Sequence, residues 1–160
     1  MRFCRVVLLT VLALAIPPLF QSQSSDRATI IAFAQKAALQ SVNFRQGDIA
    51  SLARTRADFT PEGWKDFMKH MEGFLDANGA PTFTSSFVPS KDAVFLDSKN
   101  GVVHFRIPGT LTQTSAASRT TYRAALEVYA LRDLLTHGGG SIKIQRLEQI
   151  TCVGGSTACQ

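Results

Sequence analysis

Apolar residues in the first half of the chain recur at helical spacing, and those in the second half alternate as in strands. Helix caps at Ser24–Asp26 predict a first helix that ends near Ser41–Phe44. A shorter helix is expected over Gln46–Ala57, with Ile49, Leu52 and Ala53 facing inward and Arg45, Arg54 and Arg56 outward. The apolar face of the first helix consists of Ile30, Ile31, Phe33, Ala34, Ala37, Ala38 and Leu39.

A third helix has the clearest start signal in the sequence. Thr60 is an N-cap residue, Pro61 suits the first helical position, and Glu62 adds an acid to the first turn. The helix is expected to close at Asn78-Gly79. Its apolar stripe is Trp64, Phe67, Met68, Met71, Phe74 and Leu75, which indicates a face packed in the core or, alternatively, the wall of a ligand pocket.

The residues after Pro81 predict an antiparallel sheet of about four strands. The first is a bent strand over Thr82–Val88 and Ala93–Leu96, interrupted at Pro89–Asp92. The second covers Val102–Thr114 and is kinked at Pro108-Gly109. The other two are expected over Thr120–Leu131 and Ser141–Thr151. Turns are expected at Ser98–Gly101, which contains Asn-Gly, and at Ser115–Ser118, and a bulge near Arg146. Helices followed by strands indicate an α+β fold, with three N-terminal helices packed on one face of the sheet.

The N-terminus has the three parts of an export signal. Met1–Arg5 is basic, Val6–Ala15 is almost purely apolar, and Ser22-Gln23-Ser24 places small residues two apart, as signal peptidase requires. Residues 1–24 are therefore predicted to be a signal peptide, and residues 25–160 a single α+β domain with a cysteine-bracketed tail. The alternative is a short N-terminal anchor, although Val6–Phe20 would span only about 22 Å of a core of about 30 Å.

Composition supports one globular domain and argues against nucleic-acid binding. The 160 residues are 45% apolar and 18% charged, which excludes a disordered chain. Lys and Arg number 17 against 12 acids, a formal charge of +5, and two of these cations are Arg2 and Arg5 in the predicted signal. The remaining basic residues are scattered and form no stripe that would follow a phosphate backbone.

Two cysteines near the C-terminus predict a disulfide. A hairpin with Gly155-Ser156 as its loop would place Cys152 opposite Cys159, within disulfide range. The alternative is a redox or metal pair, but six intervening residues are too many for a CxxC motif, and no histidine completes a zinc set. A disulfide would form in the periplasm or outside the cell.

Catalytic motifs for nucleophilic hydrolysis, phosphate binding and zinc proteolysis are absent from the sequence, and we expect no cofactor and no metal. Of the three histidines, His104 alternates with Val103 and Phe105 and so faces away from them. Two positions are open: the exposed face of the sheet, or a cavity where Tyr122 or Glu127 would complete an acid–base site.

The segment around the third helix carries a more specific pattern. It contains Phe59, Thr60, Gly63, Trp64 and Phe67, after an Asn43-Phe44 pair. In these residues the chain resembles the IcmL/DotI family, an inner-membrane component of type IV secretion and conjugation machines. The likeness extends more loosely over residues 28–150.

The resemblance implies a periplasmic domain with a cone-like, curved-sheet fold similar to nuclear transport factor. It implies an assembly role without catalysis, with other secretion-apparatus or envelope proteins as partners and a homo-oligomer as a further option. The family carries a full transmembrane helix before this domain, so membrane contact here is expected only if the N-terminal segment stays uncleaved and anchors the protein to the inner membrane. The alternative function is a small exported ligand-binding protein or enzyme that uses the cavity of the cone.

Overall fold

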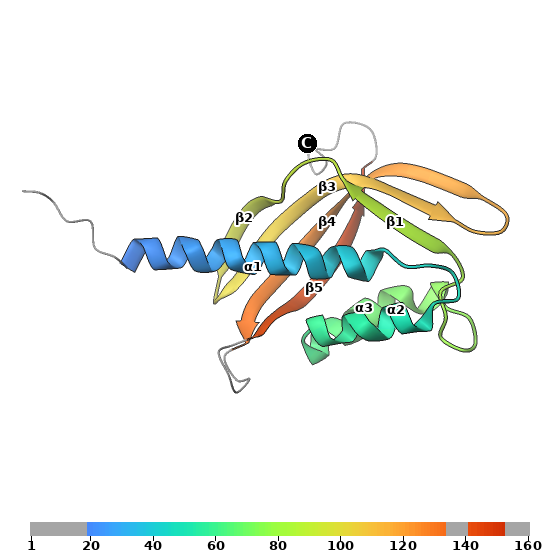
Figure 1. Cartoon of the computed structure of the whole chain (residues 1–160), viewed down its shortest axis with the longest axis horizontal. Coiled ribbons are helices and arrows are strands. Elements are labelled where there is room, and N and C mark those ends of the chain that lie inside the picture. Colours follow the sequence, from blue (N-terminus) through green and yellow to red (C-terminus); the bar gives the residue numbers. More distant parts are fainter. Residues whose placement is uncertain (1–18, 134–140, 153–160) are drawn as a thin grey trace, which may run out of the picture.

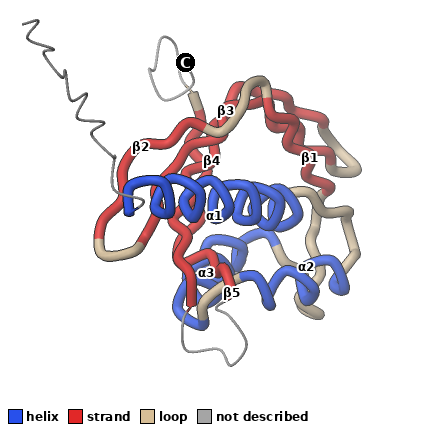
Figure 2. The backbone as a smooth tube through the Cα atoms, turned by 60° about the vertical axis from the view of Figure 1, so that its left-hand side comes forward, coloured by secondary structure: helices blue, strands red, loops and turns tan. Residues whose placement is uncertain are grey.

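The computed structural model describes residues 19–133 and 141–152. In this part of the chain the helices precede the sheet. In Figure 1, α1 crosses the strands, and α2 and α3 lie below the C-terminal half of α1. A second view shows the three helices on the same side of the sheet (Figure 2). The helical elements are α1 Leu19–Val42, α2 Ile49–Thr55, the 3-10 helix η1 Arg56–Asp58, α3 Pro61–Met71 and the 3-10 helix η2 Glu72–Phe74.

The first helix begins earlier than its cap residues predicted. It starts at Leu19 and passes through Ser24–Asp26 as helix. No proline or glycine separates Leu19 from Asp26, so nothing forces the chain to begin the helix at the serines. The predicted end near Ser41 is confirmed at Val42.

The second helix is shorter than predicted, because Gly47 has a φ of 79° and cannot belong to a right-handed helix. Asp48 caps the helix instead, and its side chain accepts a hydrogen bond from the Ser51 N–H at 3.0 Å. The two turns bury Leu52 and Thr55. The inward positions predicted for Ile49 and Ala53 are wrong, since both are exposed, whereas Arg45, Arg54 and Arg56 are exposed as predicted.

The third helix starts as predicted and ends early. Thr60 is the N-cap and Pro61 the first helical residue. The helix stops at Met71, and the chain continues as a 3-10 turn that contains Gly73, a poor helix former. Phe74 consequently leaves the apolar stripe and is 47% exposed. The predicted closure of the helix at Asn78-Gly79 is therefore wrong: Gly79, with a φ of 78°, lies in a turn after the helical segment.

The sheet is antiparallel and has five strands, in the order β1–β3–β4–β5 with β2 also paired to β3. Their bounds are β1 Thr84–Pro89, β2 Val94–Lys99, β3 Val102–Thr114, β4 Arg119–Asp133 and β5 Ser141–Thr151. The predicted α+β class is confirmed. The count is five because the interrupted first strand forms two separate strands.

Those two strands share one edge of β3. β2 pairs with Val102–Arg106, and β1 pairs with Gly109–Thr114. Pro108 lies between the two pairings, and its carbonyl accepts a hydrogen bond from the Ser90 N–H at 2.9 Å. The N–H and the carbonyl of a strand residue point to the same side. An N–H at position 108 would therefore point to the edge between the two pairings, where neither β1 nor β2 needs a donor. β3 is therefore continuous through the predicted kink.

The last strand has the predicted bounds and the predicted bulge. Tyr129 of β4 pairs with Arg146, and Ala130 pairs with Ile144, which leaves Gln145 as the extra residue. A bulge shifts the alternation of side chains. This explains why Ile144 and Leu147 both face the core although three positions separate them.

The core lies between α1, α3 and the inner face of the sheet. The side of α1 that packs on the sheet carries small residues, and its Ala34, Ala37 and Ala38 are buried. They let the helix approach the strands closely, and larger side chains of β3 and β4 fill the layer: Val103, Phe105, Ile107, Leu111, Leu126 and Val128. α3 packs on β5, and α2 packs on α1.

Within residues 19–133 and 141–152, no helix combines the length and hydrophobicity that a membrane span requires. The basic head and apolar core of the predicted signal lie outside the described residues, and so does Cys159. The signal peptide, the domain limits and the disulfide therefore stay predictions.

Candidate functional site

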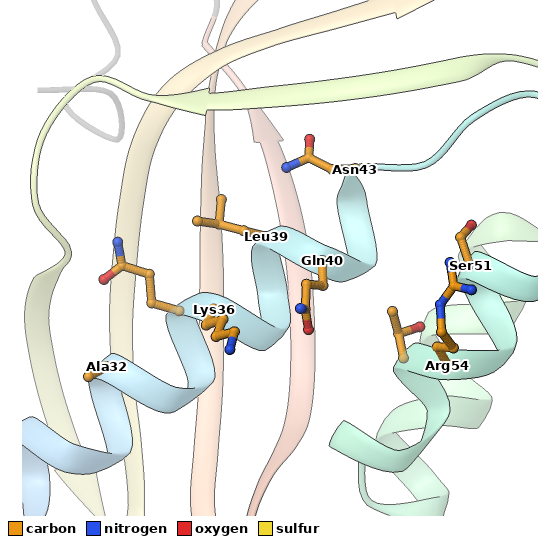
Figure 3. Close-up of a pocket in the computed structure, with 9 residues that line it drawn as sticks. Ala32, Lys36, Leu39, Gln40, Asn43, Ser51 and Arg54 are labelled. Atoms are coloured by element: carbon orange, nitrogen blue, oxygen red, sulfur yellow. The ribbon is translucent and has the colours of Figure 1, made fainter.

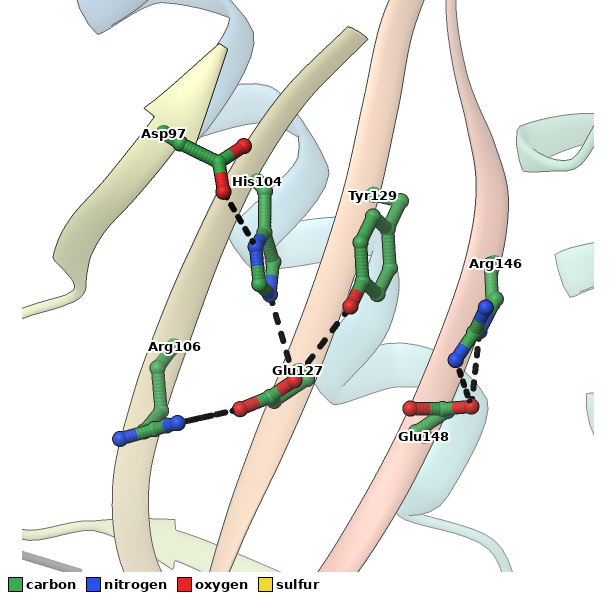
Figure 4. A network of polar contacts seen from close by, with 7 residues as sticks. All are labelled: Asp97, His104, Arg106, Glu127, Tyr129, Arg146 and Glu148. Carbon is green, nitrogen blue, oxygen red and sulfur yellow. Dashed lines mark hydrogen bonds and ion pairs between the residues drawn. The ribbon is translucent and has the colours of Figure 1, made fainter. Parts of the chain in front are cut away.

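His104 lies on the outer face of the sheet, within a row of polar side chains that runs across the strands (Figure 4). Its Nδ1 is 3.4 Å from Asp97 Oδ2 on β2, and its Nε2 is 3.2 Å from Glu127 Oε2 on β4. Its ring stacks on Tyr129, with 4.1 Å between the centroids and 10° between the planes. The imidazole thus joins three strands, and its side chain is only 14% exposed.

Glu127 is the most buried charge of this row, at 8% exposure. Arg106 donates to Glu127 Oε1 through both Nε, at 3.0 Å, and Nη2. Burial alone would raise the pKa of the Glu127 carboxyl, but the hydrogen bonds and positive charges of Arg106 and His104 outweigh it. The pKa of Glu127 is therefore lowered from its usual value of 4.5.

The row continues to β5 through an aromatic ring. Arg146 lies over the Tyr129 ring at 4.9 Å, and its Nε donates to Glu148 at 2.7 Å. Burial raises the pKa of Tyr129, and the negative charge of Glu127 raises it further. Each acid of the row has a basic neighbour, an arrangement that stabilises the packing of four strands on their outer face.

The structure separates His104 from Tyr122, one of the two partners that the acid–base hypothesis offered. It brings His104 and Glu127 together, but on the face away from the helices. Tyr122 packs on the opposite face against the core. The hypothesis of a His104 acid–base site inside the cavity is therefore wrong, and the alternative position on the outer face is confirmed.

The motif residues of the third helix meet at the bulge of β5. The Thr60 hydroxyl accepts a hydrogen bond from the Gly63 N–H at 3.0 Å, and the Thr60 N–H donates to the Ile144 carbonyl at 2.9 Å. Three rings pack beside this contact, with centroid distances of 5.3 Å for Phe59–Phe67, 5.8 Å for Phe59–Trp64 and 5.7 Å for Trp64–Phe67. These residues anchor α3 to the sheet.

A cavity of about 460 Å³ lies between α3, the end of α1 and the sheet. Its wall includes an aromatic chain in which Phe83 contacts Phe44 at 5.3 Å and Phe74 at 5.4 Å. Sequence patterns offered the Trp64 stripe as core or as pocket wall. The structure places Trp64 outside the cavity lining and Phe67 and Met71 within it.

A second hollow, a groove of about 740 Å³, lies between α1 and α2 (Figure 3). Lys36 reaches it from α1 and Arg54 from α2, and the described residues that line it include no acid. Sequence reasoning missed this groove, because it depends on how the two helices diverge after the loop at Gly47.

The remaining polar side chains suggest no metal centre. Among the described residues, no group of three His, Cys, Asp or Glu side chains is arranged to hold a metal ion. Cys152 ends the described chain, and its backbone N–H donates to the Arg123 carbonyl at 3.0 Å.

No protein-family model and no curated protein sequence matches the chain. Solved structures do. An IcmL-like type IV secretion system protein from Legionella pneumophila has a TM-score of 0.63 over 82% of this chain and 97% of its own, at 11% identity. The periplasmic domain of DotI gives 0.62 over 76% and 93%, at 20% identity. The chain has the fold of these secretion-system domains.

A third structure shares this fold. CagV, a VirB8 homologue of a type IV secretion system from Helicobacter pylori, gives a TM-score of 0.56 over 78% of this chain and 99% of its own, at 10% identity. The likeness implied by the motif around α3 is thus confirmed at the level of the fold.

Proposed function

We propose that the chain is an envelope protein-interaction module of a type IV secretion or conjugation apparatus, of the IcmL/DotI type, with an assembly role and no catalysis. One observation carries the proposal. The matched structures are components of type IV secretion systems, and this chain covers 93% to 99% of the length of the Legionella protein, the DotI domain and CagV. The similarity therefore concerns whole domains, not a shared fragment.

Two further features support this function. The outer face of the sheet carries charges that neutralise one another, as in Arg106–Glu127 and Arg146–Glu148, which suits a rigid scaffold. The signal-like N-terminus supports export, with the domain in the periplasm after cleavage or held at the inner membrane by an anchor. The proposed partners are other apparatus or envelope proteins and, as a further option, a second copy of the chain.

The groove between α1 and α2 is the surface we propose for such a partner. It has one cation on each wall, Lys36 and Arg54, and no acid among its described lining residues, so it complements an acidic protein segment. Among the described residues, the ion-pair partner of Arg54 is Asp48 at 4.0 Å, and the Arg54 side chain is 72% exposed. Its charge is therefore largely available to a partner.

The test is chemical cross-linking in the cells that express the chain, followed by mass spectrometry of the captured envelope proteins and of the N-terminus of the bait. We expect apparatus components, and a chain that starts near Ser25. Recovery of the processed chain without any apparatus component would contradict the assembly role. A chain that still starts at Met1 would show that the segment is an anchor.

Two double variants test whether the partner binds in the groove or elsewhere on the surface. Lys36→Glu with Arg54→Glu should abolish capture of the partner. The control, Lys65→Glu with Lys69→Glu, makes the same charge change at exposed positions of α3 outside the groove. If both double variants lost capture of the partner to the same extent, the overall charge of the chain, and not the groove, would determine capture.

A further inference from the structure

The cavity between the helices and the sheet has the size and lining of a ligand site. Its volume of about 460 Å³ lies within the roughly 300–1,000 Å³ usual for small-molecule pockets. Its floor is deeply buried, since Phe44, Phe67 and Met71 are 6%, 7% and 9% exposed. Phe74, at 47% exposure, stands at its mouth. An apolar body can therefore enter past Phe74 and be enclosed by rings.

Uncharged polar groups converge on one side of this cavity. Ser85 of β1 is 6% exposed, and its hydroxyl forms no hydrogen bond to another described residue. Gln113 pairs with Ser85 across the strands, and its amide likewise has no partner among the described residues. Tyr122 accepts a hydrogen bond from Gln149 at 3.1 Å, which leaves its own hydroxyl hydrogen free to donate.

Among the described residues, no fully buried side-chain nitrogen or oxygen lacks a hydrogen-bond partner. The Ser85 hydroxyl is therefore accessible from the cavity, where a bound ligand can form a hydrogen bond with it. Ser85 lies in β1, whose backbone also bonds to Phe44 in both directions, at 3.1 and 2.9 Å. Its position is thus held by the fold, and the hydroxyl is preorganised toward the cavity.

The charges around the cavity select the ligand class. Besides the phenol of Tyr122, the described ionisable residues that line it are His70, which is exposed, and Glu148, which is bonded to Arg146. The polar side of the cavity, formed by Ser85, Gln113 and Tyr122, carries no charge. An ionised head group would be desolvated there without an opposite charge.

We propose that this cavity binds an uncharged amphiphile, with its apolar body against the phenylalanine wall and one hydroxyl, amide or aromatic-amine head bonded to Ser85 and Gln113. The site is independent of the assembly role, because a purified chain without partners suffices to test it.

The probe is N-phenyl-1-naphthylamine, an uncharged aromatic amine with one N–H donor, whose fluorescence rises in apolar sites. Titration of the full chain should give saturable binding to one site. Decanol should displace the probe at a concentration about tenfold or more below that of decanoate, because the carboxylate would lose its hydration without a partner. Absence of saturable binding would overturn the proposal.

Two variants locate the binding. Ser85→Ala removes one hydrogen bond and should weaken probe binding about two- to tenfold. Phe74→Ser removes the ring at the mouth and should weaken it too. The matched control is Phe33→Ser, because Phe33 is 43% exposed and lines no part of the cavity. Circular dichroism and Trp64 fluorescence establish that each variant is folded.

Three further outcomes would contradict the proposal. Binding that neither Ser85→Ala nor Phe74→Ser weakens would place the probe elsewhere and overturn the proposal. Equal weakening by Phe33→Ser would do the same. Displacement by decanoate as effective as that by decanol would refute the uncharged class of ligand.

Discussion

Gly63 in the first turn of α3 lies directly on the backbone of Gln145, the bulged residue of β5. A β-carbon at Gly63 would lie 2.5 Å from the Gln145 carbonyl oxygen and 2.7 Å from that of Ile144. The Ile144 carbonyl also accepts the Thr60 hydrogen bond, so it has little freedom to move. The helix reaches the strand only because this position has no side chain.

Gly63→Ala should therefore destabilise the protein by about 1–3 kcal/mol through overpacking. The higher helix propensity of alanine, worth about 1 kcal/mol, offsets only part of this. The measurement is the free energy of unfolding in urea. Gly73→Ala is the control, because a β-carbon there meets nothing within 4 Å. A loss in Gly73→Ala as large as that in Gly63→Ala would contradict the close approach.

Thr60→Ala should cost about 0.5–2 kcal/mol of stability, because it removes the oxygen that accepts the Gly63 N–H. Thr60→Ser keeps that oxygen and should remain close to the wild type in the same urea titration. If Thr60→Ser lost as much free energy of unfolding as Thr60→Ala, the methyl group of Thr60, and not its capping oxygen, would be responsible.

Glu127→Gln should lower stability at neutral pH by about 1.5–3 kcal/mol, the range for hydrogen bonds to charged groups. Because the pKa of Glu127 is lowered on folding from 4.5, its ionised form stabilises the folded state above the unfolded value. That contribution disappears as the pH falls through the folded pKa. The stability difference between wild type and variant should therefore shrink below about pH 4.5.

Urea unfolding between pH 7 and pH 3 measures this difference. Glu72→Gln is the control, since Glu72 is exposed and lies outside the network of Glu127. Surface changes of this kind alter stability by about 0.5 kcal/mol or less. A gap between wild type and Glu127→Gln that stays constant with pH would show that the carboxylate is not what Arg106 and His104 stabilise.

The predicted disulfide between Cys152 and Cys159 has a direct chemical test. The chain contains three cysteines, so alkylation without reduction should label only Cys4, or none if the signal is removed. Alkylation after reduction should label Cys152 and Cys159 as well. Cys159→Ser should lose about 2.5 kcal/mol of stability, as expected for closing so short a loop. Full labelling before reduction would contradict the pairing.

Much of the sheet could be predicted because its turns determine its register. A two-residue turn at Asn100-Gly101 places Asp97 opposite His104, which is the pairing observed. A turn at Ser115–Ser118 places Arg106 opposite Glu127 in the same way. The polar row could thus have been read from strand alternation and turn length, although the acid–base hypothesis used only the alternation.

Other features depend on contacts between distant segments. The bulge at Leu96 interrupts the β2 register between Phe95 and Asp97, and nothing in the local sequence marks it. The early end of α3 exposes Phe74, against a periodicity that predicted burial. The cavity needs residues of α1, α3 and four strands to converge, and no spacing along the chain encodes that convergence.

β2 shares the edge of β3 with β1, yet all six of its residues are exposed. Two side-chain contacts hold it among the described residues. Asp97 contacts His104, and the guanidinium carbon of Arg27 lies 4.4 Å from the centroid of the Phe95 ring. β2 can therefore separate as its own cooperative unit while β1, with Ser85 and Phe87 buried, stays paired. Amide hydrogens of Val94–Lys99 should exchange with solvent well before those of β1, which makes this end of the sheet the least protected part of the strand framework.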